Sequence, residues 1–127
     1  MPGSSAVVVD ASAIAALVFN EPASDDVVEQ IGKARLVAPS LLPYELANVY
    51  VVKVRRYPDQ KPALDRAFSM LDSLDIELVA VPADAAGAQA SESGLTAYDA
   101  AYLWLARRLG VGLVTLDRKL EAAAGEG

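Results

Sequence analysis

The sequence predicts a single α/β domain with a mostly parallel central sheet of four or five short strands and helices on both faces. Short apolar runs alternate along the chain with longer segments that carry helix start and stop signals. Strands that alternate with helices in this way are typical of parallel sheets. The length of 127 residues suits one domain with a substantial core, and the chain shows no internal repeat or linker.

The first part of the chain is predicted to contain a strand, two helices and a second strand. Residues 6–9 are an apolar run bounded by polar residues, as in a buried strand. Ser12 is placed to cap a helix that continues to about residue 19. Serine and two aspartates begin a second helix at residues 24–34. Residues 36–38 form a second brief strand.

The middle of the chain is predicted to be mainly helical. Pro43 suits the first turn of a helix that ends at residue 56, because proline lacks an N–H that this turn does not use. Residues 63–73 have the apolar spacing of an amphipathic helix. Residues 76–81 form a third strand, and the alanine-rich residues 83–93 a small helix.

The last part contains the most apolar helix of the chain. Thr96 is a good N-cap for a helix at residues 97–109, and Gly110 is placed to end it. Residues 113–116 then read as a fully buried strand. Such a segment needs protein on most sides, so we expect it at the centre of the fold. A final short helix is predicted at residues 118–124, with a flexible leader at 1–5 and a loose tail at 125–127.

Composition limits the chemistry that the chain can perform. There is no cysteine and no histidine, so thiolate and imidazole are both missing as metal ligands or bases. Any bound metal must therefore sit on oxygen atoms, which favours Mg²⁺ or Mn²⁺ over zinc. The hydrophobic fraction of 54% and mean hydropathy of +0.28 are high for a soluble monomer and indicate a partner surface, most simply a homodimer.

The charge pattern sets weaker limits. A net charge of −6 argues at first against a nucleic-acid partner, although net charge hides how charges are distributed. No basic signal-peptide start precedes the first apolar run, and no apolar run approaches membrane-spanning length. We therefore expect a cytoplasmic protein without a membrane partner.

Four acidic residues are predicted to meet at one edge of the sheet. Asp10 and Asp117 end the first and fourth predicted strands, and parallel strands all end at the same edge. Glu45 lies in the first turn of the helix that leaves the second strand. Asp99 lies in the first turn of the helix that leads back to the fourth strand, so that turn lies at this edge too. The small helix before it must then lie across the edge.

Each acid alone has a structural explanation, as a helix cap or as a first-turn charge that suits the helix dipole. Together they do not, because two unit charges about 4 Å apart repel by roughly 4 kcal/mol at an effective dielectric of about 20. A divalent cation among the four carboxylates would remove this repulsion. The sequence therefore predicts a site for Mg²⁺ (or Mn²⁺) that performs phosphoryl chemistry.

Several neighbouring residues are expected to support the site. Ser12 and Thr115 each lie two residues from a site aspartate and could hydrogen-bond a carboxylate, although Ser12 is equally suited to a plain N-cap. Asn48, one turn after Glu45, is a weaker candidate for the same role. Arg118 and Lys119 follow Asp117 directly and are candidates for RNA phosphate contact.

Other basic and aromatic residues have simpler explanations. The basic clusters that end the helices at residues 43–56 and 97–109 fit dipole complementation better than RNA contact. Tyr44, Tyr50 and Trp104 are expected in the core or an interface rather than as base-stacking residues.

Four sequence blocks together resemble a known family. They are VVVDAS at residues 7–12, LLPYELANV at 41–49, LTAYDAAYLWLARRLG at 95–110 and LVTLDRKL at 113–120. In this order and at this chain length, they resemble the PIN-domain ribonucleases, specifically the VapC-type toxins of toxin–antitoxin pairs. The four acids of the family motif fall on Asp10, Glu45, Asp99 and Asp117, and none is missing.

The resemblance implies further properties. Members of the family are hydrolases that cleave RNA with magnesium or manganese and leave a 5′-phosphate and a 3′-hydroxyl. They commonly form homodimers, and a cognate VapB-type antitoxin silences them by covering the acidic edge with its C-terminal segment.

Two other readings stay open at this point. The chain could be a non-catalytic PIN-like interaction module that uses its apolar faces to bind a partner. A phosphotransfer receiver or haloacid-type phosphatase also places an aspartate after a buried strand. Receivers need a second acid beside the first, where Val8 and Val9 stand, and the phosphatases need an aspartate at the position of Ser12.

Overall fold

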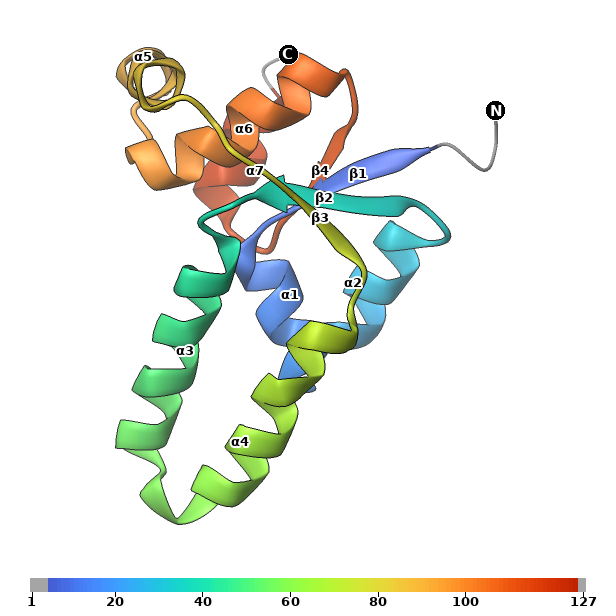
Figure 1. Ribbon diagram of the computed structural model, residues 1–127. Coiled ribbons are helices and arrows are strands. Elements are labelled where there is room, and N and C mark those ends of the chain that lie inside the picture. The colour runs from blue at the N-terminus through green and yellow to red at the C-terminus, as the bar shows by residue number, and fades with distance from the viewer. Residues whose placement is uncertain (1–4, 126–127) are drawn as a thin grey trace.

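The computed structural model describes residues 5–125, which form an α/β fold (Figure 1). Residues 1–4 of the expected leader and 126–127 of the expected tail lie outside the described residues. The elements follow in the order β1 (Ala6–Val9), α1 (Ala11–Val18), α2 (Ser24–Ile31), β2 (Arg35–Pro39), α3 (Leu42–Arg56), α4 (Lys61–Ser69), β3 (Ile76–Val79), α5 (Ala83–Ser93), α6 (Ala97–Leu109), β4 (Gly112–Val114) and α7 (Arg118–Gly125). Short 3-10 turns at Pro58–Gln60 and Met70–Ser73 flank α4.

Four parallel strands form one sheet in the order β3-β2-β1-β4. The predicted fold class, a mostly parallel sheet of four or five strands, is therefore confirmed. Strands β1 and β2 occupy the middle and bury Val8, Val9 and Val37 almost completely. Because all strands run the same way, their carboxyl ends lie along one edge, which the following turns and helix starts surround.

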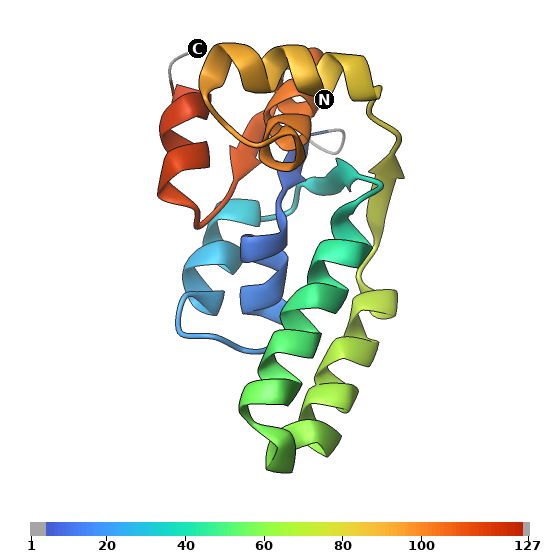
Figure 2. The same cartoon turned by 90° about the vertical axis from the view of Figure 1, so that its left-hand side faces the viewer.

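Helices cover both faces of this sheet, as predicted. Helices α1 to α4 lie on one side and α5 to α7 on the other (Figures 1 and 2). Helices α3 and α4 form a hairpin that projects away from the sheet. Helix α5 is seen nearly end-on in Figure 1, so it crosses the direction of the strands, and it packs against α6.

The prediction that residues 95–117 form the centre of the fold is correct for the helix and wrong for the strand. Helix α6 packs on β1 and β2 and buries Tyr102, Leu103 and Leu105. Strand β4, in contrast, is a three-residue edge strand with Gly112 exposed. Beyond Val114, the N–H groups of Leu116 and Asp117 bond to side-chain hydroxyls instead of to a neighbouring strand.

The helix starts differ from the prediction at two places. Asp10, not Ser12, is the N-cap of α1, and its Oδ1 accepts a hydrogen bond from the Ala13 N–H at 3.0 Å. Ser12 instead lies within the first turn. Helix α4 begins two residues earlier than expected, at Lys61, because Pro62 fits the first helical turn and does not need to precede it.

The ends of three elements also differ. Helix α2 stops at Ile31, because Gly32 leaves the helix with φ of 55°. Strand β3 ends at Val79, opposite Pro39, where its neighbour β2 also ends. Gly125 is the last residue of α7, so that helix runs one residue further than expected.

No helix within residues 5–125 has the length and apolar character needed to cross a membrane.

Candidate active site

Asp10 lies at the carboxyl end of the central strand β1, where its side chain is 5% exposed. Three groups donate hydrogen bonds to its carboxylate: the Ala13 N–H, the Ser12 hydroxyl at 2.7 Å and the Thr115 hydroxyl at 2.5 Å. Burial raises the pKa of Asp10, and these three hydrogen bonds oppose that rise. Asp10 is thus held in one orientation by its own helix start and by the chain segment after β4.

Ser12 and Thr115 connect Asp10 to the segment that carries Asp117. The Ser12 hydroxyl accepts a hydrogen bond from the Leu116 N–H at 2.9 Å, and the Thr115 hydroxyl accepts one from the Asp117 N–H at 3.0 Å. Each hydroxyl therefore donates to the Asp10 carboxylate and accepts from the backbone beyond β4. These bonds fix the position of Asp117 relative to Asp10.

Glu45 lies in the first turn of α3, next to the central strands. Its Oε1 accepts a hydrogen bond from the Tyr102 hydroxyl at 2.5 Å, which joins α3 to α6 across 57 residues of sequence. Burial raises the pKa of Glu45, as do the nearby charges of Asp99 and Asp10, while the bond from Tyr102 lowers it. Burial and the neighbouring carboxylates in turn raise the pKa of Tyr102, so the phenol stays protonated and can donate.

Asp99 and Asp117 complete the group from the other face. Thr96 caps α6, because its Oγ1 accepts from the Asp99 N–H at 3.1 Å. Burial raises the pKa of Asp99, and the charges of Asp117 and Asp10 raise it further. Asp117 is exposed and precedes α7, where its Oδ1 accepts from the Leu120 N–H at 3.0 Å. Asp117 therefore acts as the cap of α7.

Strand ends and first helical turns place the four carboxylates at the same edge of the sheet, and their charges influence one another's pKa values there. The charge of Asp117 raises the pKa of Asp10, and the charges of Asp99 and Asp10 raise the pKa of Glu45. The charges of Asp117 and Asp10 raise the pKa of Asp99. Four elements, far apart in sequence, thus bring these charges to the same edge of the sheet. Desolvation and like charge both disfavour the ionised state of such a group, and a cation would reverse this preference.

The donor set suits a hard divalent cation, because it consists entirely of carboxylate oxygens. The side-chain positions do not yet close around an ion: within residues 5–125, no three acidic side chains form a group that could hold a metal. Asp10 and Glu45 direct oxygens toward Thr115, Ser12 and Tyr102 instead. The donor chemistry therefore fits a metal, whereas full coordination requires side-chain rearrangement.

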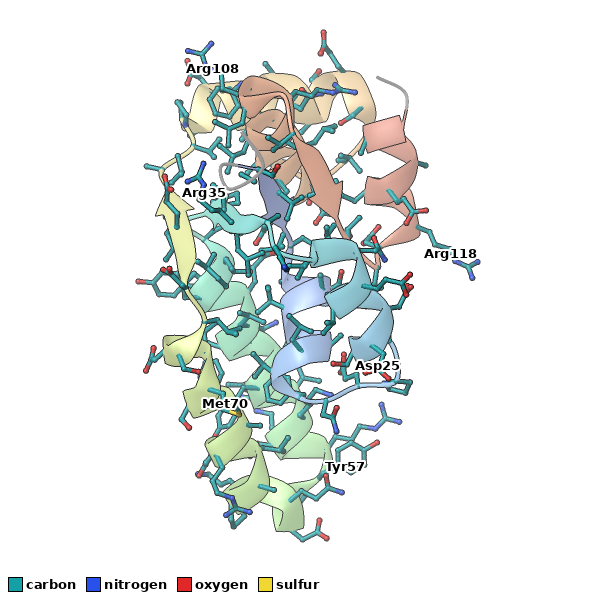
Figure 3. All side chains as sticks on the ribbon, turned by 90° about the vertical axis from the view of Figure 1, so that its right-hand side faces the viewer. Asp25, Arg35, Tyr57, Met70, Arg108 and Arg118 are labelled. Atoms are coloured by element: carbon teal, nitrogen blue, oxygen red, sulfur yellow. The ribbon has the colours of Figure 1, made fainter. Side chains whose placement is uncertain are left out.

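The remaining candidates from the sequence lie at varying distances from the acids. Lys119 is close enough for its charge to lower the pKa of Asp99. Arg118 is exposed and extends outward from the edge of the molecule (Figure 3). Asn48 is exposed and shares a cavity with Glu45, but within the described part of the chain its side chain makes no hydrogen bond to the acids.

Two aromatic features of this region were not predicted. Tyr102 donates a hydrogen bond to Glu45. The sequence feature that indicates this role is the position of Tyr102 one helical turn after Asp99, on the same face of α6. Tyr44 was expected in the core or an interface, and a core position is wrong, since the side chain is 80% exposed. Tyr50 stacks on Phe68 with ring centroids 4.9 Å apart, and Trp104 packs against the core.

Comparison with known proteins agrees with this fold. The chain matches the PIN domain family over residues 7–126. It is 36% identical over 119 residues to Ribonuclease VapC3 of Pyrobaculum aerophilum, covering 90% of this chain and 91% of that protein.

Two solved structures are similar in fold. The crystal structure of PAE2754 from Pyrobaculum aerophilum matches with a TM-score of 0.74 at 30% identity, over 94% of this chain and 86% of that one. The structure of VapC20 from Mycobacterium tuberculosis, a toxin that cleaves the sarcin–ricin loop, matches with a TM-score of 0.66 at 17% identity, over 93% and 95%. The chain thus belongs to the PIN-domain family, and its resemblance to the VapC-type members is confirmed.

Proposed function

We propose that this protein is a VapC-type toxin that hydrolyses RNA phosphodiester bonds as a divalent-metal-dependent endoribonuclease. The observation that carries the proposal is the gathering of Asp10, Glu45, Asp99 and Asp117 at one edge of the sheet, where burial and mutual repulsion raise the pKa of three of them. Like charges brought to one edge of the sheet disfavour each other's ionised state, and a bound cation would relieve that repulsion. The 36% identity to a ribonuclease over most of both chains supports the same conclusion.

Mg²⁺ or Mn²⁺ would be held by these four carboxylates and would supply the positive charge that activates water and stabilises charge on the phosphate. In the hydrolysis, water adds to phosphorus and the bond to the 3′ oxygen breaks, which leaves a 3′-hydroxyl and a 5′-phosphate. The chain contains no histidine, so the acids are the groups that can accept the proton from water.

The polar neighbours keep the acids in position for this reaction. Ser12 and Thr115 orient the Asp10 carboxylate and tie it to the segment of Asp117. The Tyr102 hydroxyl restrains Glu45. Lys119, close to Asp99, offers a positive charge to an RNA phosphate at the rim of the site.

The same family assignment supports two partners in this proposal. A VapB-type antitoxin would neutralise the toxin, and a homodimer would cover part of the apolar surface that remains exposed, which includes Val52, Leu78 and Leu109. The antitoxin and the second subunit are the partners expected of a toxin that acts on RNA in the cytoplasm.

One observation favours the alternative of a non-catalytic interaction module: within residues 5–125 the acidic side chains do not close into a metal-binding group. RNA cleavage separates the two functions. The purified protein should cleave a mixed RNA pool with Mg²⁺ and stop when chelator is added. The double variant Asp10→Asn, Asp99→Asn should be inactive, while Asp84→Asn, which removes an exposed first-turn acid of α5, should cleave like the wild type.

Full cleavage by the double variant would contradict the site assignment. Absence of cleavage by the wild type on every RNA and with both Mg²⁺ and Mn²⁺ would favour the interaction module.

A further inference from the structure

Two exposed tyrosines stand beside the acidic site. Tyr44 is 80% exposed and Tyr98 is 67% exposed, and each immediately precedes a site acid, Glu45 and Asp99. Side chains of consecutive residues of an α-helix point about 100° apart. Each acid is therefore partly buried while the tyrosine before it stays in solvent. The first turns of α3 and α6 therefore each present an acid and, next to it, an aromatic ring in solvent.

Both tyrosines line the same cavity, which has a volume of about 440 Å³. Glu45 and Asn48 also line it, together with the apolar side chains of Ala11, Leu41 and Val49. Tyr98 lies one helical turn before Tyr102, whose hydroxyl bonds to Glu45, so this face of α6 is turned toward α3. The cavity is thus continuous with the acidic site through Glu45.

We propose that Tyr44 and Tyr98 are positioning residues that stack on a nucleobase of single-stranded RNA in this cavity and so place the adjacent phosphodiester at the acids. The proposal rests on the ribonuclease function proposed above and specifies how its substrate is held. Single-stranded RNA exposes base faces for stacking on aromatic side chains, whereas paired bases in a duplex are covered.

The lining of the cavity favours a base over a protein segment. Its volume is within the range of roughly 300–1,000 Å³ that small-ligand pockets have. Asn48 offers an amide donor and acceptor that can pair with a base edge. A docked protein helix needs an elongated apolar groove with anchors at successive turns, whereas here two polar side chains of α3, Glu45 and Asn48, interrupt the apolar wall.

The test uses single-stranded RNA oligonucleotides of mixed sequence that carry 2-aminopurine, whose fluorescence falls when the base stacks. Binding is measured in the Asp99→Asn background with Mg²⁺, where cleavage is prevented. Adding Tyr44→Ala or Tyr98→Ala should weaken RNA binding by about 5- to 150-fold each and reduce the fluorescence quenching. Tyr44→Phe and Tyr98→Phe keep the ring and should bind like the tyrosine proteins.

Tyr57→Ala is the matched control. Tyr57 is also exposed, but it follows the far end of α3, at the remote end of the helical hairpin (Figure 3). Its removal should leave RNA binding unchanged. In proteins with Asp99 intact, the alanine changes at Tyr44 and Tyr98 should raise KM more than they lower kcat, because stacking holds substrate and transition state alike.

The outcomes separate this proposal from the proposed function. If the wild type cleaves RNA but the alanine variants bind and cleave equally well, base stacking is wrong and the ribonuclease function stands. If the wild type neither binds nor cleaves RNA, both are wrong. If Tyr44→Ala or Tyr98→Ala changes the oligomeric state and leaves RNA binding unaltered, the tyrosines belong to a protein interface and the proposal is overturned.

Discussion

At the scale of single residues, Asp10 is the most constrained side chain of the site. It caps α1 and also receives hydroxyl hydrogen bonds from Ser12 and Thr115, so a structural role and a place in the acidic group coincide. Burial and the charge of Asp117 raise its pKa, while the three donors favour its ionised form. The hydroxyls therefore help to keep a buried carboxylate charged, which a cation-binding acid requires.

Thr115→Val tests the contribution of one hydroxyl. The variant keeps the shape of the side chain but removes the donor to Asp10 and the acceptor for the Asp117 N–H. We expect a loss of roughly 1–3 kcal/mol in the free energy of unfolding, measured by urea denaturation, together with a lower kcat for RNA cleavage. Thr115→Ser retains the hydroxyl and serves as the control. Equal stability of the valine and threonine proteins would contradict this role.

Asp99→Asn tests whether the acids repel one another in the metal-free protein. Asp99 does not cap α6, since Thr96 does, and the charges of Asp117 and Asp10 raise its pKa. Removing its charge should raise the melting temperature by a few degrees in the presence of chelator and abolish cleavage. Asp84→Asn, at the equivalent first turn of α5, should not raise it. A lower melting temperature for Asp99→Asn would indicate that the helix dipole outweighs the repulsion.

The four acids lie at the strand ends and first helical turns that the sequence pattern indicated, because these points have a fixed place in a parallel sheet, and their role as one site stays a prediction. The sequence did not predict Tyr102 as the partner of Glu45 or the exposure of Tyr44. Both depend on how α3 packs against α6, which the apolar pattern of neither helix specifies. An aromatic residue at a helix start looks the same in sequence whether it lies in the core or in solvent.

At the scale of elements, helix capping holds two of the four acids, Asp10 and Asp117, at the edge of the sheet. Asp10 and Asp117 each cap the helix that follows a strand, so both the strand end and the helix start hold the carboxylate in place. The predicted helices agree with the structure in number and order, and the errors fall at their ends. Strand β4 is shorter than predicted because the hydroxyls of Ser12 and Thr115 accept from the N–H groups of Leu116 and Asp117. The Thr115 bond is local, whereas the bond from Leu116 to Ser12 is a tertiary contact that local sequence does not show.

Two substitutions at Asp117 separate capping from charge. Asp117→Asn keeps an oxygen that can accept from the Leu120 N–H, so the stability of the protein should be maintained. Asp117→Ala removes the cap and should lower the free energy of unfolding by about 0.5–2 kcal/mol. Both variants should lose RNA cleavage if the charge is needed. Wild-type cleavage by Asp117→Asn would remove Asp117 from the site.

At the scale of the whole molecule, the acidic group accounts for part of the net charge of −6. With these four set aside, the other acidic residues nearly balance the 11 basic ones, so the rest of the surface does not repel RNA strongly. The fold concentrates negative charge at one edge and leaves the remaining surface close to neutral. A bound cation would further reduce the local charge that an RNA phosphate meets.

The acidic group should also give the metal-free protein an unusual dependence on pH. Asp10, Glu45 and Asp99 have pKa values above the reference values of 3.8 and 4.5, so the folded state binds protons more readily than the unfolded state. The free energy of unfolding should therefore increase as pH falls from neutral through these raised pKa values, and decrease as pH rises again.

Urea denaturation at a series of pH values with chelator checks this expectation. The double variant Asp10→Asn, Asp99→Asn should show a weaker increase toward acid, because it lacks two of the three titrating groups. Added Mn²⁺ should flatten the wild-type dependence, since the ion favours the ionised carboxylates. Identical pH dependence of the two metal-free proteins would show that the raised pKa values do not affect stability.

Calorimetric titration of Mn²⁺ into the metal-free protein tests most directly whether the four carboxylates share a divalent cation. The wild type and Asp84→Asn should both bind the ion, and the double variant Asp10→Asn, Asp99→Asn should not. Binding of Mn²⁺ to the double variant with wild-type affinity, or no binding to the wild type at all, would contradict a metal site at this edge of the sheet.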